Sequence, residues 1–355
     1  VVFRVFNGET LFEQATDDFT DSGLQEALAA LLLRVKQAGS PRSTREYQPP
    51  TWKERLEAQL DSEIRSQIPD NAGPTTPVHF GIRYQQDPIS VPASERLAHL
   101  KAMVNEVLER APQVGFKEDE ISYVGARELF AIEESIFIDR ESNLSQTLYR
   151  SAIFLTAMSG SDHVSLREGG LGGRETLKVE DGRMLGALTD LKALTSADRM
   201  VPGKYKILFS PSLAGVLAHE AFGHSQEGDT CARGRSRAWD LYQSGESAGN
   251  QHATILNNPA VFKNAEGEYA AWGSYFFDEE GWLASEHTLI QGGVLQAPMT
   301  NFTSSLRLGV PRTANGKRES FSNGVYTRQT NTYFSAGDKT YADLISQIED
   351  GFLAD

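Results

Sequence analysis

The spacing of apolar residues predicts two amphipathic helices in the first third of the chain. Apolar positions recur every three or four residues from Ser22 to Val35 and again from Ser94 to Arg110, which is the period of a helix with one buried face. The positions expected to face a core are Leu24, Leu28, Leu31, Leu32, Val35, Leu97, Leu100, Val104, Val107 and Leu108. We therefore expect two long helices that pack on a common layer.

Two hairpins are predicted in the same part of the chain. Asn7-Gly8 separates β-rich runs at residues 1–6 and 10–15, and this dipeptide is a strong signal for a two-residue hairpin turn. Residues 136–139 and 146–158 have the composition of a second, longer hairpin. Helices and hairpins together indicate an α/β layer built on an antiparallel sheet.

The second half of the chain has a different pattern, with short strands and few long helices. A helix is expected at residues 183–196 and a last helix at residues 339–349, closed by Gly351. Strands are expected at residues 204–209, 253–256, 275–277 and 287–296, the last turning at Gly292-Gly293. The predicted class is α+β, with an N-terminal α/β domain at residues 1–160. A mostly β domain follows at residues 161–355 and contains the segment His-Glu-Ala-Phe-Gly-His at residues 219–224.

Composition narrows the class of partners. Apolar residues make up 39% of the chain and charged residues 23%, as in ordinary globular proteins. A net charge of −14 argues against a binder of nucleic acid, which depends on basic patches. A single cysteine excludes an intrachain disulfide and suits a reducing compartment, and no apolar run approaches the length of a membrane span. We therefore expect a cytoplasmic protein with neither nucleic-acid nor membrane partners.

The segment from His219 to His224 carries the most specific chemistry. Two imidazoles and the carboxylate of Glu220 lie within six residues, and such a set can bind zinc and activate a water molecule. Ser210 and Pro211 form a good start for a helix that leads into this segment. The apolar residues of that helix, which we expect to face a core, are Leu213, Val216 and Leu217.

The two histidines are spaced unusually for a zinc-binding helix. In the familiar His-Glu-x-x-His pattern the histidines are four residues apart and share one face. His219 and His224 are separated by one residue more, which on a regular helix places them about 140° apart. Both rings can reach one metal only if the helix ends or carries a π-type bulge, and Gly223 is a suitable place for it.

Other features admit plainer readings beside functional ones. A histidine pair matches such a spacing by accident often enough that a pair of structural histidines is the alternative to a metal site. The glycine-rich segment at residues 169–173 could cradle a phosphate, but no Lys-Ser/Thr follows, so a hinge or tight turn is favoured. The arginines at residues 233–237 suit a solvated loop better than an anion contact. The remaining histidines are expected to be structural or exposed: His79, His99, His163, His252 and His287.

Residues 215–229 closely resemble the active-site helix of the TldD/PmbA family of zinc metallopeptidases, once called modulators of DNA gyrase. Further segments resemble that family in the same order along the chain: residues 2–18, 167–173, 315–320 and 328–333. The resemblance spans nearly the whole chain, and the helix is its most specific part. One branch of the family carries the His-Glu-x-x-x-His helix and is the peptidase, and this chain is similar to that branch.

The resemblance implies roles for individual residues. His219 and His224 would be zinc ligands and Glu220 the general base. The family's third ligand is a cysteine in a segment after the position that matches Asp355, so we expect the chain to be a piece of a longer protein. Cys231 could bind metal by proximity, although a lone cysteine is more often a small buried residue. Glu227 is the other candidate, either as third ligand or as a partner of a ligand.

The expected function is that of a zinc-dependent peptidase that hydrolyses short or unfolded peptides by means of a metal-activated water. The alternative is a homologue without catalytic activity that binds peptides or a partner chain through an incomplete metal site. Measuring the zinc content of the full-length protein distinguishes the peptidase from the homologue without catalytic activity. The resemblance also implies a dimer, formed either with an identical subunit or with an inactive homologous subunit.

Overall fold

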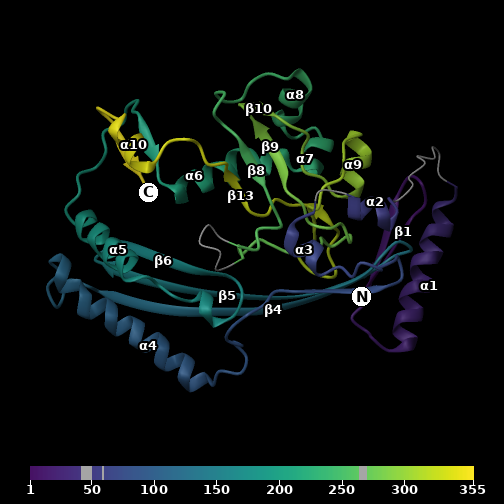
Figure 1. Cartoon of the computed structure of the whole chain (residues 1–355), viewed down its shortest axis with the longest axis horizontal. Helices are drawn as coiled ribbons and strands as arrows, with labels where there is room; N and C mark the ends of the chain where they lie inside the picture. The colour runs from purple at the N-terminus through teal and green to yellow at the C-terminus, as the bar shows by residue number, and fades with distance from the viewer. Residues whose placement is uncertain (41–49, 58–59, 264–269) are drawn as a thin grey trace.

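The computed structural model describes residues 1–40, 50–57, 60–263 and 270–355, and its fold is α+β (Figure 1). A long curved sheet forms one layer, and a second group of shorter strands and helices lies against it (Figure 1). The hairpin of β1 (Val2–Phe6) and β2 (Leu11–Ala15) and the helix α1 (Asp21–Ala38) lie at one end of the molecule (Figure 1). Both the hairpin and the helix were predicted from the sequence and are confirmed.

The long sheet is built around one central strand. β5 (Asn143–Ser159) pairs along its whole length with antiparallel β4 (Tyr123–Ile138). On its other edge, β5 pairs first with the parallel β3 (Pro77–Gly81) and then with the antiparallel β6 (Asp162–Leu171). The strand predicted at residues 136–139 begins much earlier, at Tyr123. Its charged first part lacks the apolar pattern of a strand and is held in the sheet by pairing with β5. The sheet also continues past residue 160.

The glycine-rich segment at residues 169–173 begins as the end of strand β6 and continues into a bend at Gly172 and Gly173, so the predicted turn forms only in its second half. Gly169 and Gly170 pair with Ala152 and Ser151 of β5. Gly169 has a φ of +144°, and a Cβ there would overlap the backbone of Ser151. Glycine is therefore required for the close approach of two backbones at the end of the ladder.

The buried face of β5 changes halfway along the strand. At its start the residues with even numbers are buried, including Leu144 and Leu148, and they pack against the second group of strands and helices. From Ile153 the residues with odd numbers are buried and pack against helices α4 (Ala93–Arg110) and α5 (Asp181–Leu194). Because side chains alternate between the two faces of a strand, one strand serves two cores.

The long helices are where the sequence placed them, but their buried stripes are narrower than expected. On α4, Met103 and Val107 are buried, whereas Leu97 and Leu108 are about half exposed. On α1, Leu31 is fully buried but Leu28 and Leu32 are exposed. Each helix packs against its layer on one side only, so the outer apolar residues of the predicted stripe remain in contact with solvent.

The second group of elements contains the His-Glu segment. Its central sheet has the order β10-β9-β8-β13, all antiparallel: β8 (Ile255–Asn257), β9 (His287–Gln291), β10 (Val294–Leu295) and β13 (Thr332–Phe334). The hairpin predicted at residues 287–296 is confirmed. Residues 275–277 do not form the predicted strand: all three side chains are buried, and Phe277 makes an isolated antiparallel β-bridge with Leu283. The last helix, α10 (Tyr341–Ser346), is shorter than predicted and ends well before Gly351.

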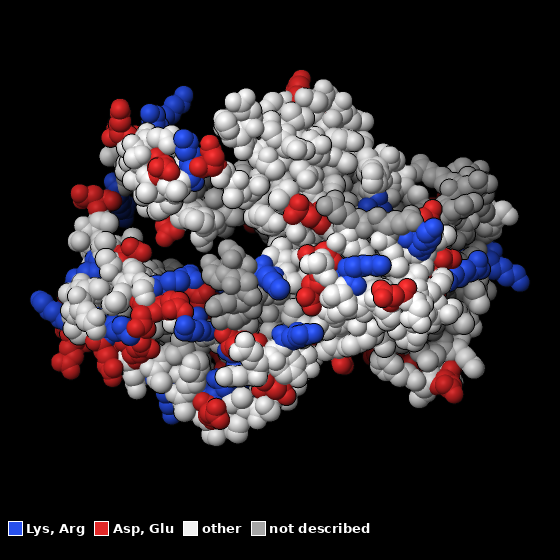
Figure 2. Space-filling view, in the orientation of Figure 1, with Lys and Arg blue, Asp and Glu red and all other residues white. Residues whose placement is uncertain are grey.

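A parallel pair of short strands, β7 (Ile207–Phe209) and β14 (Phe352–Ala354), lies near the start of the His-Glu helix. The remaining elements are α2 (Trp52–Glu57), α3 (Ser62–Ser66), η1 (Ala111–Val114), η2 (Arg174–Thr176), α6 (Pro211–Leu217), η3 (Ala218–Gly223), η4 (His224–Gln226), α7 (Gly228–Ala232), α8 (Arg237–Ser244), α9 (Phe302–Leu308), β11 (Gly316–Lys317) and β12 (Tyr326–Thr327). On the face shown in Figure 2, charges of both signs are interspersed over the long sheet and its helices, and few lie over β8 and β10. None of the described helices has the length and apolar character that crossing a membrane requires.

Candidate metal centre

The His-Glu segment is reached through a short strand and a capped helix. The Ser210 hydroxyl caps α6 by accepting a hydrogen bond from the backbone N–H of Leu213 at 3.2 Å, as predicted. Val216 and Leu217 are exposed, so the prediction that they face a core is wrong. Helix α6 lies at the surface beside β13, and the first buried residue is Ala218, one position later.

The helix is wider than an α-helix between the two histidines. Residues Ala218–Gly223 form a π-helix, and the backbone N–H of His224 donates to the carbonyl of His219. A π-helix joins residues i and i+5, so residues five positions apart come to lie above one another. The predicted bulge between the two histidines, with Gly223 inside it, is confirmed.

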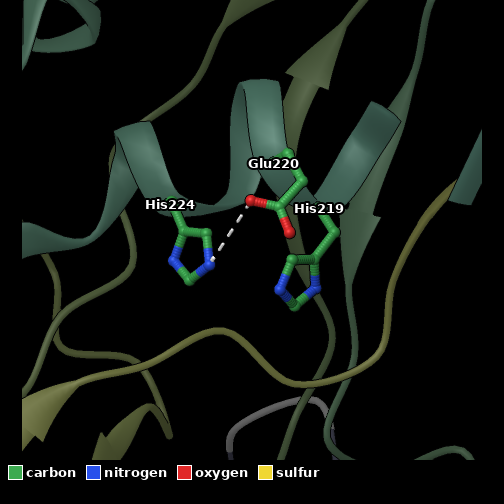
Figure 3. A group of neighbouring side chains, drawn as sticks. All are labelled: His219, Glu220 and His224. Atoms are coloured by element: carbon green, nitrogen blue, oxygen red, sulfur yellow. Dashed lines mark ion pairs between the residues drawn. The ribbon is translucent and has the colours of Figure 1, made fainter. Parts of the chain in front are cut away.

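This widened turn brings the two imidazoles together. The ring centroids of His219 and His224 are 4.8 Å apart and the rings are nearly perpendicular, at 89°. Both rings lie on one side of the helix with the Glu220 carboxylate between them (Figure 3). Ala218 and Phe222 contact the core formed with Ile255, Leu289 and Met299. The core thus holds one side of the turn, and the polar groups occupy the other.

Glu220 is close to both rings without being bound to either. Its Oε2 atom is 3.9 Å from Nε2 of His224, and its side chain is 65% exposed. One ligand atom from each of His219, Glu220 and His224 can be chosen so that all lie within 4.8 Å of one another. A carboxylate in this position can accept a proton from a water molecule held between the imidazoles.

Glu227 orients one of the two rings. It is buried, and its Oε1 atom lies 3.1 Å from Nδ1 of His224. Its Oε2 atom accepts a hydrogen bond from Arg328 at 3.0 Å. When Nδ1–H donates to a carboxylate, Nε2 is left with the lone pair that binds a metal. Both oxygens of Glu227 are therefore engaged, which favours a partner of a ligand over a third ligand.

Two residues that the sequence did not single out contact the site from a distant segment. Arg328 pairs with Glu227, and Gln329 donates from Nε2 to the carbonyl of His219 at 3.1 Å. Both belong to the segment at residues 328–333, which was noted only for its resemblance to the family. Contacts between segments about a hundred residues apart leave no periodic pattern, so no other signal in a single sequence could have identified them.

Cys231 lies outside this centre. It is 3% exposed, its thiol donates to the carbonyl of Ser225 at 3.6 Å, and burial raises the pKa of the thiol to about 11. A thiol binds metal as the thiolate, which this environment disfavours. Cys231 is thus a small buried residue rather than a ligand.

We expect Cys231→Ala to leave the zinc content of the protein unchanged, because the thiol is neither charged nor directed at the imidazoles. In the native wild-type protein the thiol should react with Ellman's reagent only slowly at pH 8, and fast after unfolding in denaturant. Rapid labelling of the native protein, or zinc loss in Cys231→Ala, would place this residue in the metal centre.

The chemistry of the donor set fits zinc. Catalytic zinc sites use imidazole nitrogen, thiolate sulfur or carboxylate oxygen ligands at about 2.0–2.3 Å, with one position left for water. Two imidazoles on one side of a helix, one oriented by a carboxylate, provide two such ligands, and their ligand atoms lie within 4.8 Å of one another. By contrast, His79 bonds to Ser145 and His287 to the carbonyl of Ala297, so these two are structural as predicted. The arginines at residues 233–237 are exposed, and Arg233 lies over the ring of Tyr326.

Comparison with known proteins relates the chain to one group of metallopeptidases. Residues 202–355 match the PmbA/TldA metallopeptidase C-terminal domain. Over 299 residues, 82% of this chain and 62% of the relative, the chain is 29% identical to a protein of Methanothermobacter thermautotrophicus named metalloprotease. It is also 29% identical, over 42% of this chain and 32% of the relative, to the zinc metalloprotease TldD homolog of Saccharolobus solfataricus. The chain spans 62% or less of the length of these relatives.

Solved structures share the fold at low sequence identity. A putative modulator of DNA gyrase from Thermotoga maritima superposes with a TM-score of 0.65 at 16% identity, covering 99% of this chain and 70% of that one. TldE from Thermococcus kodakarensis gives a TM-score of 0.59 at 14% identity, covering 99% and 71%. The matching C-terminal domain, a relative named as a TldD homolog and the shared fold together support a member of the TldD/PmbA family.

Proposed function

We propose that this protein is a zinc-dependent peptidase that hydrolyses short or unfolded peptides, with His219 and His224 as metal ligands and Glu220 as general base. The observation that carries the proposal is the π-turn, which brings two imidazoles five residues apart to one side of a helix with a carboxylate between them. The names of relatives, metalloprotease and zinc metalloprotease TldD homolog, support the same class of reaction.

Zinc, when bound, would lower the pKa of a coordinated water and polarise the carbonyl of the scissile peptide bond. The residues of this chain supply the rest of the chemistry. His219 and His224 would hold the ion as neutral imidazoles, and the bond from His224 Nδ1 to Glu227 keeps Nε2 free for this purpose. Arg328 fixes Glu227 in turn, since it pairs with the second carboxylate oxygen.

Glu220 is placed to move the proton. Its carboxylate would accept a proton from the attacking water and then donate it to the amine nitrogen that leaves when the peptide bond breaks. The exposure of its side chain suits this role, because the site must admit both water and a peptide. As a neighbour of His219 in sequence, Glu220 lies beside the ligands without competing for the same position.

Two imidazoles are one fewer than the three protein ligands typical of catalytic zinc. Glu227 is engaged by His224 and Arg328, and Cys231 is buried elsewhere. We propose that the third ligand is the cysteine that the family resemblance implies, in a segment after the position that matches Asp355. As partners we propose peptides, together with a second subunit that is either identical or an inactive homologue.

The test is metal content and peptidase activity of the full-length protein. We expect one zinc per chain by mass spectrometry, removal of zinc and activity together by a chelator, and recovery of activity when zinc is restored. If the chelator removes zinc but no peptidase activity is detected before or after the treatment, the protein is instead a binding homologue whose metal site does not catalyse.

A further inference from the structure

We infer that Gln329 is a positioning residue that holds the π-turn in the form in which His219 and His224 share a metal. This inference rests on the proposed function, since the positioned groups are the proposed ligands. It gives a role to residues 315–320 and 328–333, whose resemblance to the family carried no chemistry of its own.

The segment around Gln329 is fixed on both sides. Thr327 donates its backbone N–H to the buried carboxylate of Asp229, five residues after His224. Arg328 and Asn315 are joined by two hydrogen bonds, from the Arg328 N–H to the Asn315 carbonyl at 2.9 Å and from Asn315 Nδ2 to the Arg328 carbonyl at 3.0 Å. Thr330 donates its backbone N–H to the fully buried Asn257 at 2.7 Å. Gln329 therefore projects from a rigid support.

From this support Gln329 contacts the two backbone positions that define the widened turn. In a regular α-helix the carbonyl of His219 would accept from the N–H of Gly223. Here it accepts from the N–H of His224 and from Nε2 of Gln329. The amide also packs directly on Gly223, where a Cβ would overlap it. A second donor on the His219 carbonyl stabilises the π-type arrangement relative to the α-helical one.

The oxygen atom of the Gln329 amide contributes unfavourably to stability. Oε1 of Gln329 is buried and finds no hydrogen-bond donor among the residues that the structure describes. An unsatisfied buried acceptor destabilises a fold, and such atoms are rare in native proteins. Reversing the amide would place Oε1 against the His219 carbonyl, so the observed orientation is the one that the turn selects.

The first experiment replaces Gln329 with methionine, which has a similar length but no donor. We expect the full-length Gln329→Met variant to bind zinc at least tenfold more weakly, the loss typical when a partner of a ligand is removed, with an unchanged far-UV circular dichroism spectrum. The absorption bands of bound Co²⁺, which depend on ligand geometry, should change. Gln296→Met is the matched control, because Gln296 is also half-buried and donates from Nε2 to a backbone carbonyl at 3.1 Å.

The second experiment tests the contact without metal. Gly223 has φ −64° and ψ −60°, which alanine adopts readily, and the three atoms nearest to a Cβ there all belong to Gln329. Gly223→Ala should therefore lower the melting temperature mainly through overlap with Gln329. In a Gln329→Ala background the same change should be neutral or stabilising, because alanine favours helices over glycine. This difference between backgrounds is the coupling between the two residues.

The outcomes separate the two proposals. Weaker zinc binding in Gln329→Met, together with the Gly223 coupling, supports the positioning role. Unchanged zinc affinity in Gln329→Met, or equal effects of Gly223→Ala in both backgrounds, overturns it while leaving the peptidase proposal intact. A wild-type protein without zinc overturns the proposed function and the metal-positioning role, and the Gly223 coupling would then still report the contact itself.

Discussion

Glu220→Gln is expected to lower kcat for peptide hydrolysis by about 10²–10⁴-fold, the usual contribution of a positioned general base, while zinc remains bound. Glutamine has the size of glutamate but cannot accept the proton of the attacking water. The side chain is largely exposed, and its described contact is the 3.9 Å approach to His224. Folding should therefore be unaffected, and the loss should fall on the chemical step.

The measurement is steady-state cleavage of an unstructured peptide, with zinc determined on the same samples. Glu246→Gln is the matched control, because it removes one exposed carboxylate from the same half of the molecule and lies outside the cluster of His219 and His224. Wild-type kcat in a zinc-loaded Glu220→Gln protein would show that another group moves the proton.

The candidate metal centre was largely predictable because its parts are local. Once His219 and His224 are taken to share a metal, helical geometry demands an irregular turn between them, and the structure has a π-turn with Gly223 inside it. The chemistry of two residues thus predicted a backbone feature. The same reasoning could not say which side of α6 is buried, since Leu213, Val216 and Leu217 have the spacing of a core face in a helix that lies at the surface.

Features that depend on distant partners were not predictable. The carbonyl of His219 and the carboxylate of Glu227 receive donors from Gln329 and Arg328, and no period or spacing joins these positions. The strand at Tyr123–Ile138 was predicted only at its apolar end, because the charged first part is held by pairing with β5 rather than by its own apolar pattern. Local preference predicted helices and hairpins, whereas long-range pairing decided the lengths of the long strands.

The largest effect on stability is expected at Glu280, which takes no part in the candidate metal centre but joins two parts of the fold. This carboxylate is 2% exposed and pairs with Arg4 of β1 and with Arg312. Its Oε2 atom also accepts the backbone N–H of Phe302, the first residue of α9, at 2.6 Å. These guanidinium groups hold the pKa of Glu280 below its usual value despite burial. One side chain thereby joins the N-terminal hairpin to the half that carries the site.

Glu280→Ala should lower the free energy of unfolding by about 3–5 kcal/mol, the range for breaking a buried ion pair by removing one partner. The reason is that two nearly buried guanidinium groups and a buried N–H lose their acceptor at once. Burial raises the pKa of Asp278, whose carboxyl interacts with Arg312 and is repelled by Glu280. Because the variant removes this neighbouring negative charge, Asp278 ionises more readily and offsets part of the loss. Urea denaturation followed by tryptophan fluorescence measures the change, and Trp282, which stacks on Arg312 at 4.6 Å, reports from within the network.

The neighbouring residue provides the control for this prediction. Glu279 lies 3.9 Å from Lys317, and its side chain is 28% exposed, so Glu279→Gln should cost no more than about 1 kcal/mol, as for ion pairs in contact with solvent. A Glu280→Ala variant as stable as Glu279→Gln would mean that Glu13, which also pairs with Arg4, and Asp278 satisfy the guanidinium groups without Glu280. The hairpin would then be held to the rest of the fold by its apolar contacts, among them Phe6 against Phe302, and charge burial at Glu280 would contribute specificity of docking rather than stability.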